Sequence, residues 1–245
     1  MASMWVAVTL LLLPVLGLVL GTSVTDLVQA ARLASTWQAL GLSLGTSLVA
    51  MVGVVAVGTP LAWQLSRRPS RVLLTAVELP IVLPPAVLGV ALLETFGRMG
   101  WFGPALDAVG MHIPFTTAAV VIAQLCVAAP LYVLTATAAF SAARDDHLLV
   151  ARTLGASPLR AWFTVAVPVA APGLASAFAL SWARALAEFG ATLLFAGNLP
   201  GRTQTLPLAI YRALEHDIAQ ARALSVGMLV VAALMLLGES TYRIV

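Results

Sequence analysis

Six long apolar stretches dominate this sequence and restrict what it can fold into. They run roughly over residues 4–20, 40–65, 72–95, 115–140, 163–195 and 223–238. A helix needs about 20 mostly apolar residues to cross the ~30 Å hydrocarbon layer, where lipid offers the backbone no hydrogen-bonding partner. We therefore expect an all-α integral membrane protein with about six transmembrane helices.

The composition supports a lipid environment. Apolar residues make up 61% of the chain and charged residues 9%, whereas a soluble domain is about half apolar and about a quarter charged. We expect a single transmembrane domain over residues 1–245, because neither an internal repeat nor a low-complexity linker is visible. The first stretch has no basic residue before it, which favours a retained helix over a cleaved leader.

The cationic residues exclude several enzyme classes. All 13 are Arg, and the chain contains no Lys. A P-loop, a Schiff-base enzyme and a Ser–Lys dyad each require Lys, so this chain is not expected to hydrolyse ATP or to act as such an enzyme. We attribute the net charge of +3 to Arg on short loops and predict no nucleic-acid partner.

The sequence also predicts no catalytic residue, metal site or bound cofactor. Residues 41–45 match G-x-S-x-G, but they lie in an apolar helical run without the strand-to-helix turn or the His–acid pair of a hydrolase. His112, His147 and His216 lie on different loops, with no Cys or carboxylate at metal-ligand spacing on a shared helix face.

Arginines indicate the orientation of the chain. Arg67, Arg68 and Arg71 lie between the second and third stretches, and a second group lies between the fourth and fifth: Arg144, Arg152 and Arg160. Cytoplasmic loops retain positive charge, and an even number of helices separates these two loops. We therefore place both loops and both termini in the cytoplasm.

The second of these loops, residues 141–167, is expected to form two short amphipathic helices joined at Gly155. A helix from Arg144 to Leu154 can end at Gly155 in the left-handed conformation. Ser157 and Pro158 are typical of the N-cap and first turn of the next helix. A bent helical pair outside the bilayer suits docking into a groove of a soluble partner; the alternative is a hairpin on lipid headgroups.

The same loop carries a family resemblance. Residues 151–157, Ala-Arg-Thr-Leu-Gly-Ala-Ser, followed by Val167 and Pro168, resemble the EAA loop of bacterial ABC importer permeases. The usual Glu-Ala-Ala is replaced here by Leu-Val-Ala at 149–151. The resemblance implies that the loop couples to an ATPase subunit through Leu149, Val150, Ala151, Arg152, Thr153, Leu154, Gly155, Ala156, Ser157 and Pro158.

Three further blocks resemble the molybdate/tungstate permeases, with the sulfate/thiosulfate permeases nearby. They cover residues 79–89, 97–103 and 188–207, in the order found in that family. The resemblance implies a type I ABC permease fold and import of an oxyanion across a bacterial or archaeal cell membrane, with sulfate as the alternative to molybdate or tungstate.

Prolines, glycines and buried charges mark a candidate translocation path. We expect the third and fifth stretches to be interrupted at Pro80, Pro84, Pro85, Pro168, Pro172, Gly173 and Gly190. Arg184 and Glu188 are four residues apart, so we expect them to pair on one helical face. The candidate path or gate residues are Pro84, Pro85, Arg184, Glu188, Phe189, Gly190, Thr192 and Asn198; a purely structural ion pair is the alternative.

The resemblance also implies partners. These are ATPase subunits that bind ATP and Mg, an extracytoplasmic oxyanion-binding protein, and a second permease subunit, which is identical in molybdate-type systems and different in sulfate-type systems. Two other readings stay open. A secondary transporter would work without nucleotide and would carry unpaired buried carboxylates; an intramembrane enzyme would need a catalytic constellation.

Overall fold

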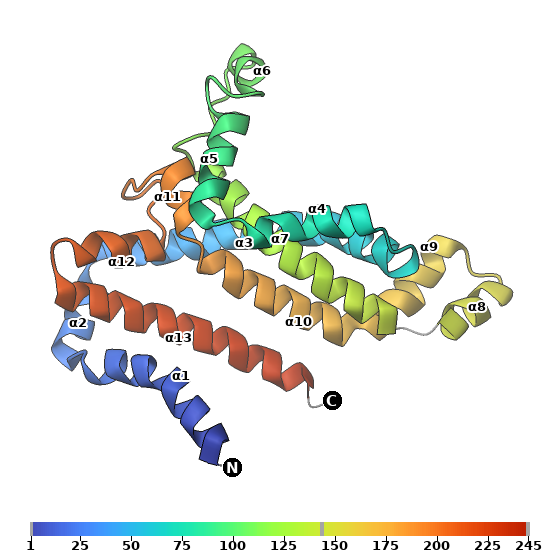
Figure 1. Ribbon diagram of the computed structural model, residues 1–245, viewed down its shortest axis with the longest axis horizontal. Helices are drawn as coiled ribbons and strands as arrows, with labels where there is room; N and C mark the ends of the chain where they lie inside the picture. The colour runs from blue at the N-terminus through green and yellow to red at the C-terminus, as the bar shows by residue number, and fades with distance from the viewer. Residues whose placement is uncertain (1, 143–144, 244–245) are drawn as a thin grey trace. The chain divides into compact units, whose positions relative to one another are not determined.

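The computed structural model describes residues 2–142 and 145–243, and within these ranges every regular element is a helix (Figure 1). In chain order the elements are α1 (Ala2–Leu20), α2 (Val24–Arg32), α3 (Ala34–Arg67), α4 (Arg71–Val82), α5 (Pro85–Phe96), α6 (Gly103–Ala108), α7 (Thr117–Ala142), α8 (Asp145–Thr153), α9 (Pro158–Ala161), a π-helical turn η1 (Trp162–Ala166), α10 (Val167–Leu186), α11 (Gly190–Ala196), α12 (Leu206–Leu214) and α13 (Ile218–Arg243). The predicted all-α class is confirmed.

Four described helical segments are long and apolar enough to cross a membrane, namely 34–67, 117–142, 158–186 and 218–235. Two further candidates are bent pairs: α1 with α2, at 72°, and α4 with α5, at 112°. The expected six spans are therefore reached if each bent pair crosses the membrane as one broken span.

The third apolar stretch is broken at its double proline, and not at Pro80, which lies inside α4. Leu83 and Pro84 both have extended ψ values, of 131° and 137°, and Pro85 opens α5. A proline disfavours the helical conformation in the residue before it, so two consecutive prolines force two consecutive extended residues. This local rule explains why α4 and α5 are separate helices.

The fifth stretch differs from the prediction at both ends. Its helix continues from Pro158 to Leu186, and α11 begins only at Gly190. Pro168, Pro172 and Gly173 lie inside α10 and do not interrupt it. The π-helical turn ends two residues before Pro168, which has no N–H to donate to a regular turn.

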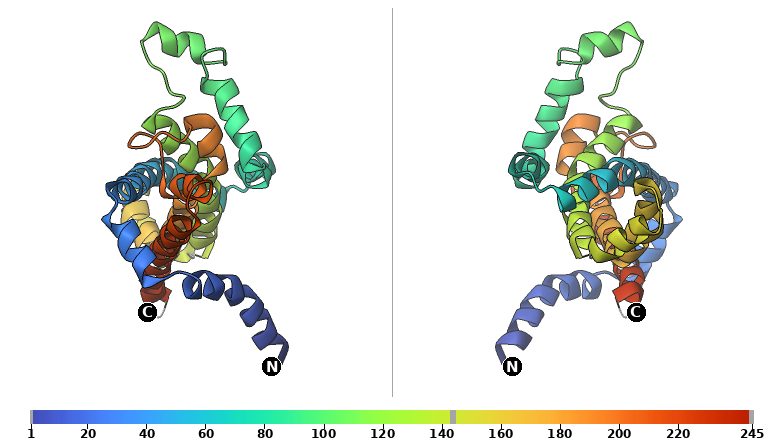
Figure 2. Two further views of the ribbon diagram at one scale, coloured as in Figure 1. Left: turned by 90° about the vertical axis from the view of Figure 1, so that its left-hand side faces the viewer. Right: turned by 90° about the vertical axis from the view of Figure 1, so that its right-hand side faces the viewer.

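Backbone contacts divide the chain into two compact units. The first contains Met1–Leu44 and Gly197–Leu234, and the second contains Gly45–Ala196 and Met235–Val245. The expected single domain therefore stays a prediction. Within the second unit, α6 projects away from the pair formed by α7 and α10 (Figure 2), whereas Leu88 and Leu92 of α5 pack against α7 and α11.

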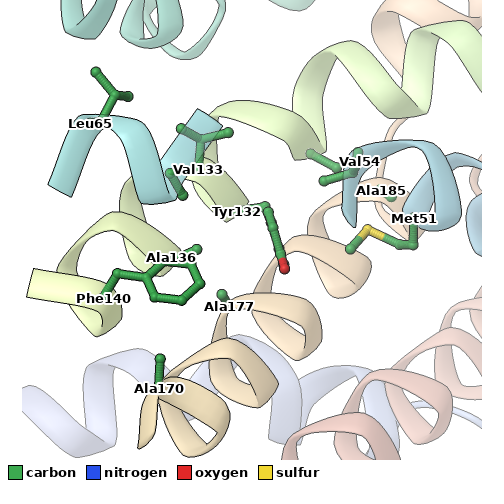
Figure 3. Close-up of a cluster of buried hydrophobic side chains, with 12 residues drawn as sticks. Met51, Val54, Leu65, Tyr132, Val133, Ala136, Phe140, Ala170, Ala177 and Ala185 are labelled. Atoms are coloured by element: carbon green, nitrogen blue, oxygen red, sulfur yellow. The ribbon is translucent and has the colours of Figure 1, made fainter. Parts of the chain in front are cut away.

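The core of the second unit is built from α3, α7 and α10. Small side chains such as Ala136, Ala170 and Ala177 let α7 and α10 approach closely, beside the fully buried ring of Phe140 (Figure 3). A Cβ added at Gly173 would lie 2.5 Å from the Cβ of Ala139. Without a hydrophobic force between helices in lipid, such close packing is a main source of stability.

The core of the first unit lies between α12 and α13. Leu206, Ala213, Ala221 and Leu224 are buried together there. The hydroxyl of Ser43 accepts a 2.7 Å hydrogen bond from the N–H of Leu206, at the start of α12. The first N–H groups of a helix have no acceptor within the helix. The serine of the G-x-S-x-G match therefore supplies an acceptor for one of them and anchors the start of α12.

Candidate functional site

The elbow after α8 has the geometry expected from its glycine. Gly155 has φ +88°. Its N–H donates to the Arg152 carbonyl, and the Ala156 N–H donates to the Ala151 carbonyl, both at 3.0 Å. These two bonds form a Schellman motif, which satisfies the last carbonyls of a helix and reverses its direction. The prediction that the helix ends at Gly155 is confirmed.

The chain resumes as a helix directly after the elbow. The hydroxyl of Ser157 accepts a 3.3 Å hydrogen bond from the N–H of Arg160, and Pro158 occupies the first turn, as expected. The prediction of a separate second helix is wrong, because α9 is four residues long and continues through η1 into α10. Residues 161–167 contain no proline or glycine that would end the helix. Arg144, the expected start of the first helix, lies outside the described residues.

The elbow exposes a group of apolar side chains. Leu149, Val150, Leu154 and Leu159 are between 56% and 83% exposed, and together they are called the elbow face here. Figure 1 shows α8 and α9 as two arms joined by a short loop. Four large apolar side chains on one short segment are typical of a surface that another molecule covers.

The breaks in the third and fifth stretches meet in space. A Cβ added at Gly190 would lie 2.8 Å from the Cβ of Pro85, and one added at Gly89 would lie 2.9 Å from the Cβ of Leu194. Leu88, Leu92, Ala191 and Phe195 are buried in the same cluster. The structure therefore brings the candidate path residues Pro84 and Pro85, at the start of α5, next to Gly190 at the start of α11.

We expect Gly89→Ala to destabilise this contact. The new methyl group would approach Leu194 and also the backbone of Ala191, at 3.2 Å, so α5 and α11 must separate. Overpacking of this kind costs about 1–3 kcal/mol, measured as a lower free energy of unfolding for the purified protein. Gly45→Ala is the control, because its Cβ would meet nothing within 4 Å. Equal stability of the two variants would contradict the close packing.

Arg184 and Glu188 form the expected ion pair. The Arg184 Nη1 lies 3.1 Å from the Glu188 Oε2, and the Glu188 side chain is 1% exposed against 39% for Arg184. The predicted geometry differs, because α10 ends at Leu186 and Glu188 lies in the break before α11. Its Oε1 accepts a 2.8 Å hydrogen bond from the N–H of Ala191. The carboxylate therefore also caps the positive end of α11.

Buried polar side chains accompany this break. Thr192, in α11, and Ser181, in α10, have fully buried hydroxyls without a hydrogen-bond partner among the described residues. Gln124, in α7, is also fully buried, and neither atom of its amide group has a partner. The sequence analysis missed Gln124, although a single Gln inside the apolar run of 115–140 is a visible signal. Phe189 lies between α10 and α11, beside Glu188.

Asn198 is the one candidate path residue that falls in the first compact unit. Its Nδ2 donates to the Leu208 carbonyl at 3.2 Å, and its Oδ1 accepts from the Gln204 Nε2 at 2.9 Å. These bonds hold the loop before α12. Among the residues that the structure describes, no group of three His, Cys, Asp or Glu could hold a metal ion.

Comparison with known proteins identifies the family. Residues 54–245 match the family described as binding-protein-dependent transport system inner membrane component. The chain is 46% identical, over 83% of its length and 78% of the relative's, to the molybdenum transport system permease protein ModB of Mycobacterium tuberculosis. It is 39% identical to the protein of the same name from Escherichia coli, over 73% of this chain and 80% of that one.

Two solved structures share the fold. One is a bacterial ABC transporter that imports the acidic polysaccharide alginate, with a TM-score of 0.75 and 15% identity, covering 100% of this chain and 95% of that chain. The other is the MetNI methionine ABC transporter in inward-facing conformations, with a TM-score of 0.64 and 17% identity, covering 85% and 93%. Because the family match extends over residues 54–245, this protein belongs to the binding-protein-dependent transport system inner membrane components and is a multi-pass transport permease that shares the fold of these ABC transporter chains.

Proposed function

We propose that this chain imports molybdate into the cytoplasm as the permease subunit of an ABC importer. The similarity to proteins named molybdenum transport system permease, up to 46% identity over 83% of the chain, is the observation that carries the substrate assignment. Tungstate has the same charge and tetrahedral shape, so it is an expected second substrate. The energy comes from ATP, which binds with Mg to a separate ATPase subunit.

The elbow is the proposed contact with that ATPase. Its residues 149–158 combine a hinge fixed by backbone hydrogen bonds with the exposed elbow face. Because α9 continues without a break into α10, a push on the elbow would reach the far end of α10, where Glu188 and α11 lie. This continuity supports a mechanical link from the ATPase to the break.

The contact between α5 and α11 is the proposed gate. Both helices begin at a break, at Pro84 and Pro85 in one case and at Phe189 and Gly190 in the other. A helix that starts at a break can tilt without bending its neighbour, and movement of α11 would bring water to the buried groups of Ser181, Thr192 and Gln124. Alternation between inward-open and outward-open states would follow from such tilting.

Selectivity is proposed to come from an extracytoplasmic oxyanion-binding protein. Among the candidate path residues Arg184 is the single cation, and it already pairs with Glu188. A pathway without strong cationic sites lets an anion pass instead of holding it. The assembly is proposed to contain two copies of this permease, two ATPase subunits and the binding protein in a lipid membrane.

Uptake into proteoliposomes tests the proposal. The permease is reconstituted with its ATPase and binding protein, and the uptake of labelled molybdate is measured in competition with tungstate and sulfate. We expect ATP-dependent uptake that tungstate inhibits strongly and sulfate weakly. Uptake without ATP would indicate a secondary transporter, and stronger inhibition by sulfate than by tungstate would contradict the substrate assignment.

We expect Leu154→Glu to weaken binding of the ATPase. Leu154 is 83% exposed on the elbow face, and a charge there would have to be buried in an apolar contact. A central interface residue typically contributes about 2 kcal/mol, so the ATPase affinity should fall by more than about tenfold. Co-purification with the ATPase and titration of the permease with it measure this affinity. Met99→Glu, at a position 98% exposed before α6, is the control and should bind normally; equal loss in both variants would contradict docking at the elbow.

A further inference from the structure

The first compact unit contains a polar cavity whose lining includes none of the proposed gate residues. Its volume is about 380 Å³, and it lies between the start of α3, the loop before α12, α12 itself and the first turn of α13. The polar lining residues are Ser35, Thr36, Gln204, Arg212, His216 and Gln220. The cavity is large enough for a small hydrated anion or a headgroup phosphate.

The charged residue in the lining of this cavity is a cation, Arg212. Arg212 and His216 line it, and no Asp or Glu does. No side-chain hydrogen bond or ion pair occupies Arg212 or His216 among the described residues. The nearby carboxylate of Asp217 accepts hydrogen bonds from the N–H groups of Ala219 and Gln220, at 2.9 and 3.1 Å, and so caps α13. Glu215 is exposed and does not line the cavity.

Uncharged polar groups in the lining are also available. The hydroxyl of Thr36 is buried and has no hydrogen-bond partner in the described chain, which is costly unless a ligand or water satisfies it. The Gln204 side chain is 6% exposed and is held by its bond to Asn198. The wall that carries these groups is fixed, because the start of α12 is bonded to Ser43.

We propose that this cavity binds a small tetrahedral oxyanion, either as a free ion or as the phosphate of a lipid headgroup. The guanidinium group of Arg212 matches two oxygens of such an anion, and hydroxyl, amide and imidazole donors can contact the others. The further assignment of the cavity as an extracytoplasmic waiting site for the transported anion rests on the proposed function and on the predicted orientation of the chain. The binding of an oxyanion to the cavity does not depend on either.

Binding to the purified permease tests the site without ATPase. The protein is placed in nanodiscs of phosphatidylcholine, and its affinity for labelled molybdate and for sulfate is measured by equilibrium dialysis. Arg212→Gln and Thr36→Val are each expected to weaken binding by about tenfold, since each removes a donor to a charged group. Arg32→Gln, an exposed Arg on α2 that does not line the cavity, is the control and should bind like the wild type.

The outcomes separate the ligand sources. Displacement of molybdate by phosphatidylglycerol in the nanodisc would assign the cavity to a lipid phosphate, and no displacement would assign it to the free ion. Equal affinity of Arg212→Gln and the wild type, or an equal loss in Arg32→Gln, would overturn the proposal. The binding test contains no ATPase, so a negative result there would not bear on ATP-driven import. A negative uptake result would likewise not bear on oxyanion binding in the cavity.

Discussion

Replacement of Gly155 by Pro is expected to abolish ATP-driven uptake while the membrane-spanning helices stay folded. Gly155 has φ +88°, and its N–H completes the hydrogen-bonded end of α8. Proline fixes φ near about −65° and has no N–H, so the elbow must adopt another shape. The pyrrolidine ring excludes a φ of +88°, so the native shape of the elbow is closed to this variant. Uptake and ATPase stimulation should therefore fall by at least about tenfold, the loss expected for a central contact with the ATPase, provided that the elbow transmits force.

Gly155→Asn is the matched control for this change. Asn tolerates the left-handed conformation better than other residues with a side chain, and a Cβ at this position would meet nothing within 4 Å. We expect the Asn variant to keep most of its coupled hydrolysis. Full coupling in the Pro variant, or equal loss in both, would show that the left-handed elbow is not required.

The second large effect is expected for Glu188→Ala. This change leaves Arg184 without its partner and removes the acceptor of the Ala191 N–H at the start of α11. Removing one member of a buried pair typically costs about 3–5 kcal/mol, and the partial exposure of Arg184 places the expected loss at about 3 kcal/mol. The unfolding temperature of the purified protein and the ATP-driven uptake measure this loss, and we expect both to fall.

Glu188→Gln separates the charge of Glu188 from its capping bond. The Gln amide oxygen can still accept from Ala191, so most of the order at the start of α11 should remain while the ion pair is lost. We expect a stability between those of the wild type and the Ala variant. If Glu188→Ala were as stable as the wild type, the pair would contribute nothing to the break between α10 and α11.

Local signals predicted the positions at which helices begin and end. The Pro84–Pro85 pair, Gly155 and Ser157 act through their own backbone and side-chain chemistry, and each lies where the structure has a break or a cap. Gly190 likewise opens α11. Such signals depend on a few neighbouring residues, so the sequence alone is sufficient to interpret them.

Other features depend on contacts far apart in the chain, and the sequence analysis missed them. Pro168 and Pro172 were expected to interrupt a helix, but α10 continues because packing against α7 compensates for the lost bonds. Glu188 was placed on the helical face of Arg184, although the cap that it provides to α11 puts it in the break. The amphipathic helices α2 and α12 are nine residues each, too short to be distinguished from loops by apolar length.

The most direct test of the account places a single cysteine on the elbow. In a Cys126→Ala background, Leu154→Cys is labelled with a membrane-impermeant maleimide, first in inside-out and then in right-side-out vesicles. We predict labelling from the cytoplasmic side, and protection when the ATPase subunit is added. Labelling from the extracytoplasmic side, or labelling that the ATPase leaves unchanged, would contradict the claim that this elbow receives the ATPase.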